Sequence, residues 1–181
     1  MSGTAPLIAF AGYKHTGKTT LIARLLTELS ARGLRVGCIK HDGHDFTLPH
    51  ADADTGKYWH AGAVATVIAS DTGHALAEWR GVSPNLEDLA ARLGLVDLII
   101  VEGFKHLAVP KWVLLGPLDG AAEYERPDFA RLPEIAGFVQ GFIVPALPLK
   151  VADTDLPVYH RDNILGILSA IDSMMRSVHD D

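Results

Sequence analysis

A glycine-rich segment near the amino end constrains this chain more than any other feature. The segment GYKHTGKT, residues 12–19, matches the pattern G-x-x-x-x-G-K-S/T without a gap. An apolar run at residues 6–11 precedes it, which predicts a buried strand. Apolar residues recur at helical spacing from Lys18 to Arg32, and Gly33 predicts the end of that helix. Strand, glycine loop and helix in this order form the context in which the pattern binds phosphate.

Each residue type in the segment has a physical role toward a phosphate chain. Gly12 and Gly17 let the backbone wrap so that its N–H groups point at phosphate oxygens, and the positive end of the helix adds to that field. Lys18 is predicted to reach the outer phosphates, Thr19 to ligate Mg²⁺, and Thr20 to donate to the inner phosphate. The predicted nucleotide-binding residues are Gly12, His15, Thr16, Gly17, Lys18, Thr19 and Thr20.

An acidic residue at the end of a neighbouring strand is needed to complete a magnesium site. The strand predicted over residues 97–103, DLIIVEG, offers two acids. Asp97 begins this strand and is expected away from the phosphates, whereas Glu102 ends it on the side of the glycine loop. We therefore predict that Glu102 positions the metal or a water molecule and is catalytic together with Lys18. Gly103 would let the backbone approach the terminal phosphate.

Strand-like and helix-like segments alternate along the rest of the chain. Further strands are predicted at 34–41, 62–70, 74–80 and 111–116, further helices at 84–94 and 161–178, and 134–144 is ambiguous. Ser83 and Pro84 predict the start of the first of these helices. This alternation predicts an α/β fold, with a mainly parallel sheet flanked by helices and sites at the carboxyl ends of the strands. The length and the lack of a long linker predict a single domain over residues 1–181.

The composition argues against several classes of function. A net charge of −6 and a pI near 5.8 disfavour a broad surface for nucleic acid or for an anionic membrane. The single cysteine, Cys38, excludes an intramolecular disulfide and a four-thiolate metal site, and its apolar neighbours predict a buried thiol. No secretory signal is recognisable, and no run approaches the roughly 20 apolar residues that span a bilayer. We therefore predict a cytoplasmic protein.

A polar cluster follows the second predicted strand toward the same edge of the sheet. Its polar residues are Lys40, His41, Asp42, His44 and Asp45. One interpretation is a transition-metal site, to which His50 and His60 would contribute. The other is a set of donors for an anionic ligand beside the nucleotide, with one of the two aspartates assisting Mg²⁺ through water. The charge of Lys40 favours the second interpretation, because a second cation beside it would be repelled.

The segments GYKHTGKTTL, IKHDGHD, HAGA and DLIIVEGFKH follow one another in this order. In this respect the chain, from residue 7 to about residue 106, resembles the molybdopterin-guanine dinucleotide biosynthesis protein B (MobB) family. The resemblance implies a P-loop NTPase fold, binding of GTP with Mg²⁺, at most slow hydrolysis, and a homodimer. It also implies a partner, the molybdenum cofactor guanylyltransferase that joins GMP to molybdopterin, and makes molybdopterin a further candidate ligand. The positions that match family motifs outside the glycine loop are Lys40, His41, His44, Asp45, Glu102 and Lys105.

Two functions fit the phosphate loop. The first is a GTP-binding accessory protein that assists the nucleotidyltransferase in converting molybdopterin to molybdopterin guanine dinucleotide. The second is a small-molecule kinase, in which a lid containing Arg126 and Arg131 would stabilise the transferring phosphoryl group. Guanine is inherited from the resemblance alone, because the common guanine-reading element N-K-x-D is absent.

Overall fold

The described part of the chain forms one large parallel sheet with helices packed on it and one separate hairpin. The computed structural model describes residues 5–12, 16–41, 57–58, 61, 65–71, 75–79, 85–104, 106–116, 138–145 and 155–179. By its contacts the chain divides into two compact units, residues 1–41 with 90–181 and residues 42–89. The single nucleotide-binding domain expected over residues 1–181 stays a prediction.

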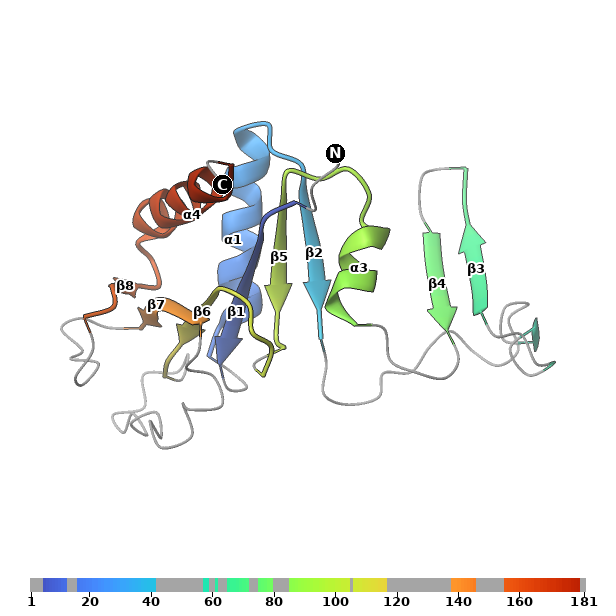
Figure 1. The fold of residues 1–181 in the computed structure, drawn as a ribbon, viewed down its shortest axis with the longest axis horizontal. Coiled ribbons are helices and arrows are strands. Elements are labelled where there is room, and N and C mark those ends of the chain that lie inside the picture. Colours follow the sequence, from blue (N-terminus) through green and yellow to red (C-terminus); the bar gives the residue numbers. More distant parts are fainter. Residues whose placement is uncertain are drawn as a thin grey trace. The chain divides into compact units, whose positions relative to one another are not determined.

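The large sheet carries the strand of the glycine loop in its interior. In sheet order its strands are β2 (Val36–Lys40), β5 (Leu98–Glu102), β1 (Leu7–Gly12), β6 (Lys111–Leu114), β7 (Val139–Val144) and β8 (Val158–His160) (Figure 1). Every neighbouring pair in this sheet is parallel, which confirms the predicted fold class. β7 shows that the ambiguous stretch 134–144 contains a strand. β8 is missing from the sequence prediction because three residues are too short to show a period.

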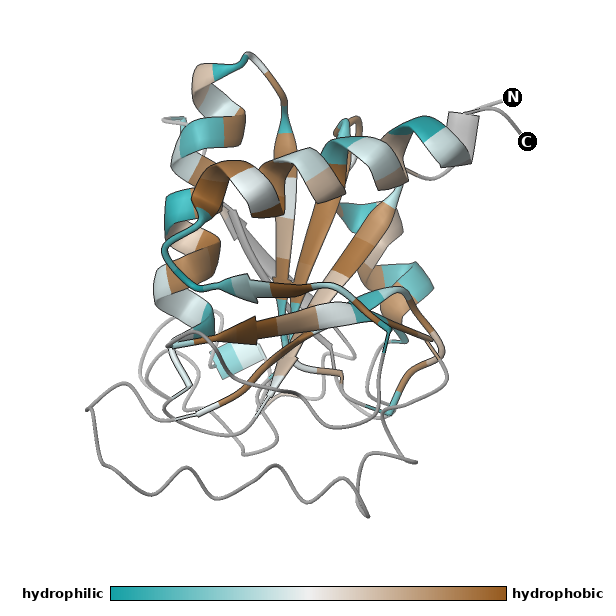
Figure 2. Ribbon diagram, turned by 90° about the vertical axis from the view of Figure 1, so that its left-hand side faces the viewer, coloured by the Kyte–Doolittle hydropathy of each residue, from teal (hydrophilic) through white to brown (hydrophobic). Residues whose placement is uncertain are grey.

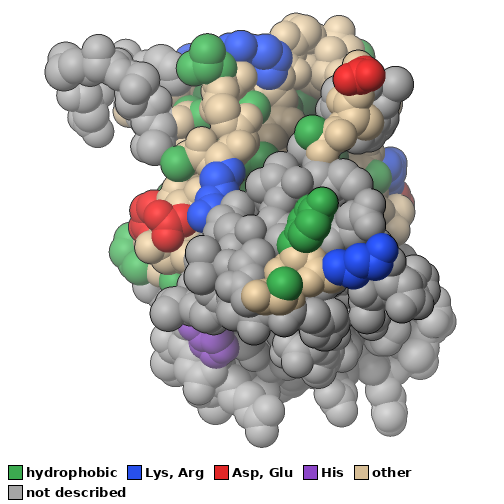
Figure 3. All heavy atoms as spheres, turned by 90° about the vertical axis from the view of Figure 1, so that its right-hand side faces the viewer, with side chains coloured by type: hydrophobic (Ala, Val, Ile, Leu, Met, Phe, Trp, Pro, Cys, Tyr) green, Lys and Arg blue, Asp and Glu red, His purple; other side chains and the backbone are tan. Residues whose placement is uncertain are grey.

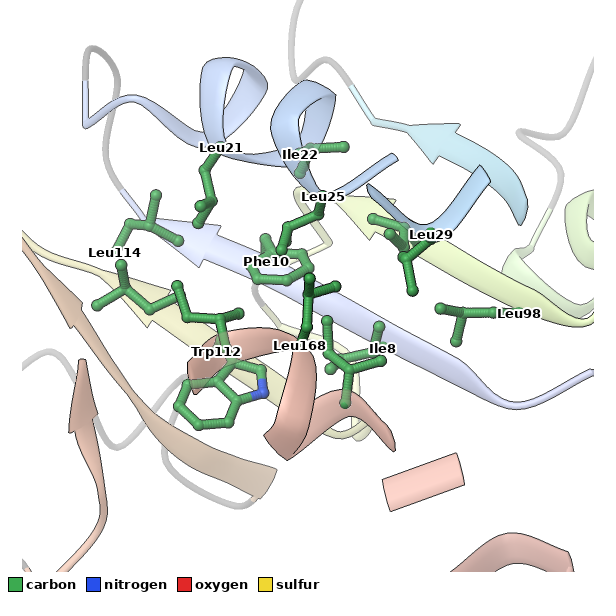
Figure 4. Packing of buried hydrophobic residues seen from close by; sticks show 14 residues of the cluster. Ile8, Phe10, Leu21, Ile22, Leu25, Leu29, Leu98, Trp112, Leu114 and Leu168 are labelled. Carbon is green, nitrogen blue, oxygen red and sulfur yellow. The ribbon is translucent and has the colours of Figure 1, made fainter. Parts of the chain in front are cut away.

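Helices α1 (Lys18–Ala31) and α4 (Ile164–His179) contribute apolar side chains to the same core as the central strands. Phe10 of β1 is fully buried and lies among side chains that include Leu25 of α1 and Leu168 of α4 (Figure 4). In Figure 2 the strands are mainly apolar, whereas the hydrophilic residues are found chiefly on the helices and turns. Burial of each large apolar side chain contributes about 1.5–3 kcal/mol, so this core fixes where α1 begins relative to β1.

A large aromatic side chain explains a glycine inside β7. Trp112 of β6 is 1% exposed, and its ring lies edge-on to Tyr159 with the ring centroids 5.2 Å apart. A Cβ atom on Gly141, the register partner of Trp112, would overlap the indole ring. Glycine in a strand interior commonly marks such a close approach. This glycine also weakens the strand pattern of the sequence, which is why 134–144 is ambiguous when it is judged by residue type.

The hairpin consists of β3 (Ala65–Ala69) and β4 (Ala75–Trp79), which pair antiparallel. The strands predicted within 62–70 and 74–80 are therefore confirmed, and they pair with each other. The two strands form a sheet of their own and do not join the parallel sheet. Residue type could not indicate this, because apolar and β-branched residues suit either kind of sheet.

Two local predictions are corrected. Helix α3 (Leu86–Arg92) is capped by Asn85, whose side-chain oxygen accepts a hydrogen bond from the Asp88 N–H at 2.8 Å. The helix therefore begins two residues later than predicted, and Ser83 and Pro84 lie outside the described residues. Cys38 is exposed rather than buried, because burial alternates along the edge strand β2 and Cys38 lies on the opposite face from the buried residues Gly37 and Ile39. Partial burial and the nearby Glu102 carboxylate still raise the pKa of the thiol.

Candidate phosphate and metal site

The glycines of the loop between β1 and α1 are required by the backbone. Gly12 has φ 148°, and a Cβ there would lie 2.6 Å from the Leu114 carbonyl oxygen. Gly17 has φ 86° and is the N-cap of α1. Both backbone conformations are ones that residues with a Cβ adopt only with strain. The two glycines therefore fix the path of the loop into the helix, as the sequence predicts.

The amino end of α1 differs from those of α3 and α4. Asn85 caps α3, and the Asn163 side chain accepts a hydrogen bond from the Gly166 N–H of α4 at 3.0 Å. Gly17 gives α1 no side-chain cap, and the first turn of α1 contains no acidic residue. A helix amino end carries partial positive charge and N–H donors. This end of α1 is therefore suited to an anion that comes from outside the chain.

Lys18 places its ammonium group over the loop. Its Nζ donates to the Gly12 carbonyl oxygen at 3.1 Å and lies 3.5 Å from Oγ1 of Thr16, which is itself buried. Burial lowers the pKa of Lys18, the Glu102 carboxylate raises it, and the Lys40 ammonium lowers it. The two ammonium groups thus act on each other through space, and the Glu102 carboxylate offsets part of their charge.

Glu102 connects three elements at the carboxyl edge of the sheet. The Thr19 hydroxyl of α1 lies 2.9 Å and 3.0 Å from the two Glu102 carboxylate oxygens. Lys40 of β2 is the register partner of Glu102, and its Nζ lies 3.8 Å from Oε1 of that carboxylate. The Glu102 side chain is 13% exposed, whereas that of Lys40 is 58% exposed. The structure therefore brings Thr19, Lys40 and Glu102 together beside Lys18, and their roles toward a ligand stay predictions.

The donor set fits a hydrated magnesium ion next to phosphate. Mg²⁺ prefers oxygen ligands and is usually bound by one or two protein groups together with water and phosphate oxygens. The Thr19 hydroxyl and the Glu102 carboxylate are such oxygen donors, and they lie within hydrogen-bond distance of each other. Lys18 and Lys40 supply the positive charge that a phosphate chain needs.

The residues that follow Glu102 adopt an unusual backbone. Gly103 has φ 98°, and a Cβ there would lie 2.8 Å from the His41 carbonyl oxygen. Phe104 has φ 48°, a conformation that costs a residue with a Cβ about 1–2 kcal/mol. Its ring lies 4.4 Å from the His41 ring, centroid to centroid, with 39° between the planes. Aromatic pairs of this kind contribute about 0.5–1.5 kcal/mol, so the contact offsets much of the strain.

Phe104 is a residue that the sequence prediction missed. It belongs to no phosphate-binding pattern, and its importance comes from a backbone angle that residue type does not reveal. The signal available in the sequence was its position, directly after the Glu102–Gly103 pair. His41, by contrast, was predicted at this edge as a contact to an anion or cofactor, and the structure also places it against the Phe104 ring.

Several predicted residues lie outside the described residues. They are His15, Asp42, His44, Asp45, His50, His60, Lys105, Arg126 and Arg131. Among the residues that are described, no group of three or more histidine, cysteine or acidic side chains is placed to hold a metal ion. The transition-metal interpretation and the kinase lid both stay predictions, because all of the proposed ligands except His41, and both lid arginines, lie outside the described residues.

Two further observations concern the helices and the surface of the described residues. Within the described ranges, no helix has both the length and the apolar character needed to cross a bilayer. On the face drawn in Figure 3, the acidic and basic side chains of the described residues are interspersed and gather into no broad basic area.

Comparison with known proteins identifies the family. Residues 7–128 match the family model MobB, described as molybdopterin guanine dinucleotide synthesis protein B. The chain is 42% identical over 130 residues to the molybdopterin-guanine dinucleotide biosynthesis adapter protein of Escherichia coli, covering 68% of this chain and 70% of that protein. It is 32% identical over 164 residues to the protein of the same name from Haemophilus influenzae, covering 79% of this chain and 92% of that protein.

Solved structures agree with this match. The fold is similar to that of a MobB protein homolog from Bacillus stearothermophilus, with a TM-score of 0.67, 26% identity, and coverage of 94% of this chain and 98% of that one. It is also similar to Bacillus subtilis MobB, with a TM-score of 0.68, 26% identity, and coverage of 92% and 96%. From its sequence, its parallel sheet and its glycine loop, the chain belongs to the MobB family.

Proposed function

We propose that this protein is a GTP-binding adapter in molybdenum cofactor biosynthesis, acting where molybdopterin is converted to molybdopterin guanine dinucleotide. The relatives from Escherichia coli and Haemophilus influenzae are named adapter proteins of this biosynthesis. The observation that carries the nucleotide part of the proposal is the contact of Thr19 with Glu102, directly beside Lys18. These groups come from the helix after the glycine loop and from a neighbouring strand, as a phosphate and magnesium site requires.

Different residues of the site would contact different parts of the ligand. The loop from Gly12 to Thr20 would hold the phosphate chain through backbone N–H groups and the Lys18 ammonium. Thr19 and Glu102 would hold Mg²⁺, which when bound neutralises charge on the phosphate oxygens. Lys40 would add a second positive charge at the outer edge, where 58% of its side chain is exposed.

Slow hydrolysis is consistent with the way in which Glu102 is held. Both of its carboxylate oxygens lie within hydrogen-bond distance of the Thr19 hydroxyl. This arrangement suits a carboxylate that fixes a metal ion better than one that removes a proton from water. A protein of this kind holds a triphosphate for some time, and a partner can recognise the loaded state. We propose the molybdenum cofactor guanylyltransferase as that partner, in the cytoplasm, with the adapter acting as a homodimer and molybdopterin as a further ligand.

Titration with GTP and with ATP in the presence of Mg²⁺ tests the proposal directly. We expect calorimetry to show that GTP binds at least about tenfold more tightly than ATP, a difference of about 1.4 kcal/mol. Removal of Mg²⁺ by a chelator should weaken the binding of GTP. The absence of binding by either nucleotide at millimolar concentration would refute the proposed function. Rapid turnover that depends on a small-molecule acceptor, and not on the guanylyltransferase, would instead support the kinase.

A further inference from the structure

We propose that the contacting rings of His41 and Phe104, here called the latch, position Lys40 and Glu102 for a triphosphate and let the protein discriminate GTP from GDP. This inference rests on the proposed function, because it concerns the regulation of the same site. Neither ring belongs to the phosphate loop or to the pair of groups proposed to hold Mg²⁺. Both are therefore proposed as positioning residues.

The latch joins the carboxyl ends of two neighbouring strands. Lys40 and Glu102 are register partners in β2 and β5. The next backbone group along β2, the N–H of His41, donates to the Glu102 carbonyl oxygen at 2.9 Å, so the pairing continues past both charged residues. The His41 ring then contacts Phe104, two residues after Glu102. A change in this contact therefore acts on the backbone that carries both Lys40 and Glu102.

Gly103 lies between Glu102 and the latch and is held from both sides. Its N–H donates to the Phe10 carbonyl oxygen of β1 at 3.2 Å. On the other side, the space that a Cβ would need is taken by the His41 carbonyl oxygen, 2.8 Å away. Because Gly103 is packed between the ends of two strands, Phe104 cannot shift without moving the backbone next to Glu102.

The backbone at Phe104 makes the latch a balanced contact. Among the described residues, Phe104 is the one residue other than glycine with a positive φ. This conformation opposes the latch, while the tilted ring contact with His41 and the hydrogen bond from the Leu107 N–H to the Phe104 carbonyl oxygen, at 3.0 Å, favour it. Opposing contributions of similar size leave the equilibrium open to a ligand that prefers one state.

A terminal phosphate is the ligand group that can supply this preference. It would lie on the side of Thr19, Lys40 and Glu102, where the carboxyl ends of the strands meet the amino end of α1. GDP lacks that group and would contact the inner part of the loop alone. The formed latch would therefore favour GTP over GDP, and binding of GTP would in turn favour the formed latch.

The test compares the affinities for GTP and GDP, in Mg²⁺, of wild type, His41→Ala, Phe104→Ala and the double variant. We expect the preference for GTP over GDP to fall about fivefold to tenfold in each single variant, and no further in the double variant, because both changes remove one contact. His41→Phe keeps a ring against Phe104 and should keep the preference within about twofold of wild type. Phe104→Gly also removes the ring, and glycine adopts the positive φ without strain. This variant replaces Phe104→Ala in the test if Phe104→Ala does not fold.

Two measurements separate positioning from general damage. Phe138→Ala removes a phenyl ring that is 45% exposed at the start of β7, and should leave the preference unchanged. Amide hydrogen exchange at Gly103, whose N–H donates to Phe10, should be faster in Phe104→Ala and in His41→Ala than in wild type. GTP should slow this exchange in wild type more than GDP does.

The outcomes distinguish the latch from the proposed function. If wild type binds neither nucleotide, both proposals are wrong. If wild type binds GTP and the single variants keep its preference over GDP, the latch is wrong and the proposed function stands. Additive losses in the double variant also overturn the latch. So does a loss in His41→Phe as large as that in His41→Ala, because it would show that the imidazole contacts the nucleotide directly.

Discussion

The two acids at the ends of β5 are held in different ways. Asp97, just before the strand, accepts hydrogen bonds from Nη2 and Nε of Arg35 at 2.7 Å and 3.1 Å, and from the Arg35 backbone N–H at 2.8 Å. These bonds lower the pKa of Asp97 to about 2. Glu102, at the other end of the strand, faces a neutral hydroxyl from Thr19 at 2.9 Å and the Lys40 ammonium at 3.8 Å.

The difference lies in what each end leaves for a ligand. Asp97 and Arg35 carry one negative and one positive charge, and these neutralise each other within the pair. At the Glu102 end, the carboxylate lies 3.8 Å from the Lys40 ammonium and also acts electrostatically on the Lys18 ammonium, raising the pKa of Lys18, so two positive charges accompany one negative charge. The excess of positive charge lies beside the amino end of α1, which no side chain caps. The same strand therefore has a structural acid at its amino end and an acid suited to a ligand site at its carboxyl end.

The largest expected effect is on the affinity for GTP, when a cation is removed at one end of β5 and compared with removal of a cation at the other end. Lys18→Ala should weaken GTP binding about 100-fold or more while the protein stays folded, because a charged contact to the phosphates is lost. Arg35→Ala, which removes the partner of Asp97, should leave the affinity unchanged. Calorimetry gives the affinities and thermal unfolding checks the fold. An unchanged affinity in Lys18→Ala would refute the site.

Amide substitutions of the two acids give the next largest effect. Glu102→Gln keeps the shape and an oxygen that can still ligate Mg²⁺ but removes the charge, so it should spare binding and, by placing the metal less well, slow GTP hydrolysis about tenfold or more. Asp97→Asn should leave the hydrolysis rate at its wild-type value. The measurement is single-turnover release of phosphate from bound GTP. If wild type and Glu102→Gln hydrolyse GTP at equal rates, Glu102 has no part in the reaction.

Alanine substitutions at glycines on either side of β5 extend the comparison to the backbone. Gly94 has φ 71°, and nothing lies within 4 Å of the position that a Cβ would take there. Gly94→Ala should therefore cost about 1–2 kcal/mol of unfolding free energy, from backbone strain alone. Gly103→Ala adds an overlap with His41 and should cost about 2–4 kcal/mol. Urea unfolding measures both, and equal losses would contradict the close packing of Gly103.

The smallest expected effect is the pH dependence that Asp97 contributes. Its folded-state pKa of about 2 lies below the ordinary value of 3.8, so the pair with Arg35 adds stability above about pH 4. That contribution should decrease as the pH falls from about 4 to about 2. The difference in unfolding free energy between wild type and Asp97→Asn should shrink over this interval. A difference that stays constant would show that Arg35 does not perturb Asp97.

The sequence predicts the elements whose signals are local. The glycine loop, α1 and the strand before it follow from residues that lie close together in the chain. The side of Glu102 could also be predicted, because parallel strands place their carboxyl ends at one edge of a sheet. Two predictions were wrong: the start of α3, where the local cap at Asn85 was overlooked in favour of Ser83 and Pro84, and the burial of Cys38, which depends on how the two faces of β2 are covered in the fold.

By itself the sequence determined that a phosphate loop joins a strand to a helix and that an acid ends a nearby strand. The tertiary structure alone decided that Thr19 meets Glu102 across 83 positions of the chain, and that Phe104 takes a left-handed backbone against His41. The physical reason is the range of the interactions. Backbone preference and periodicity act between residues that are close in the sequence. The strand order β2, β5, β1 is instead fixed by burial of the whole core, which no short segment of the sequence reveals.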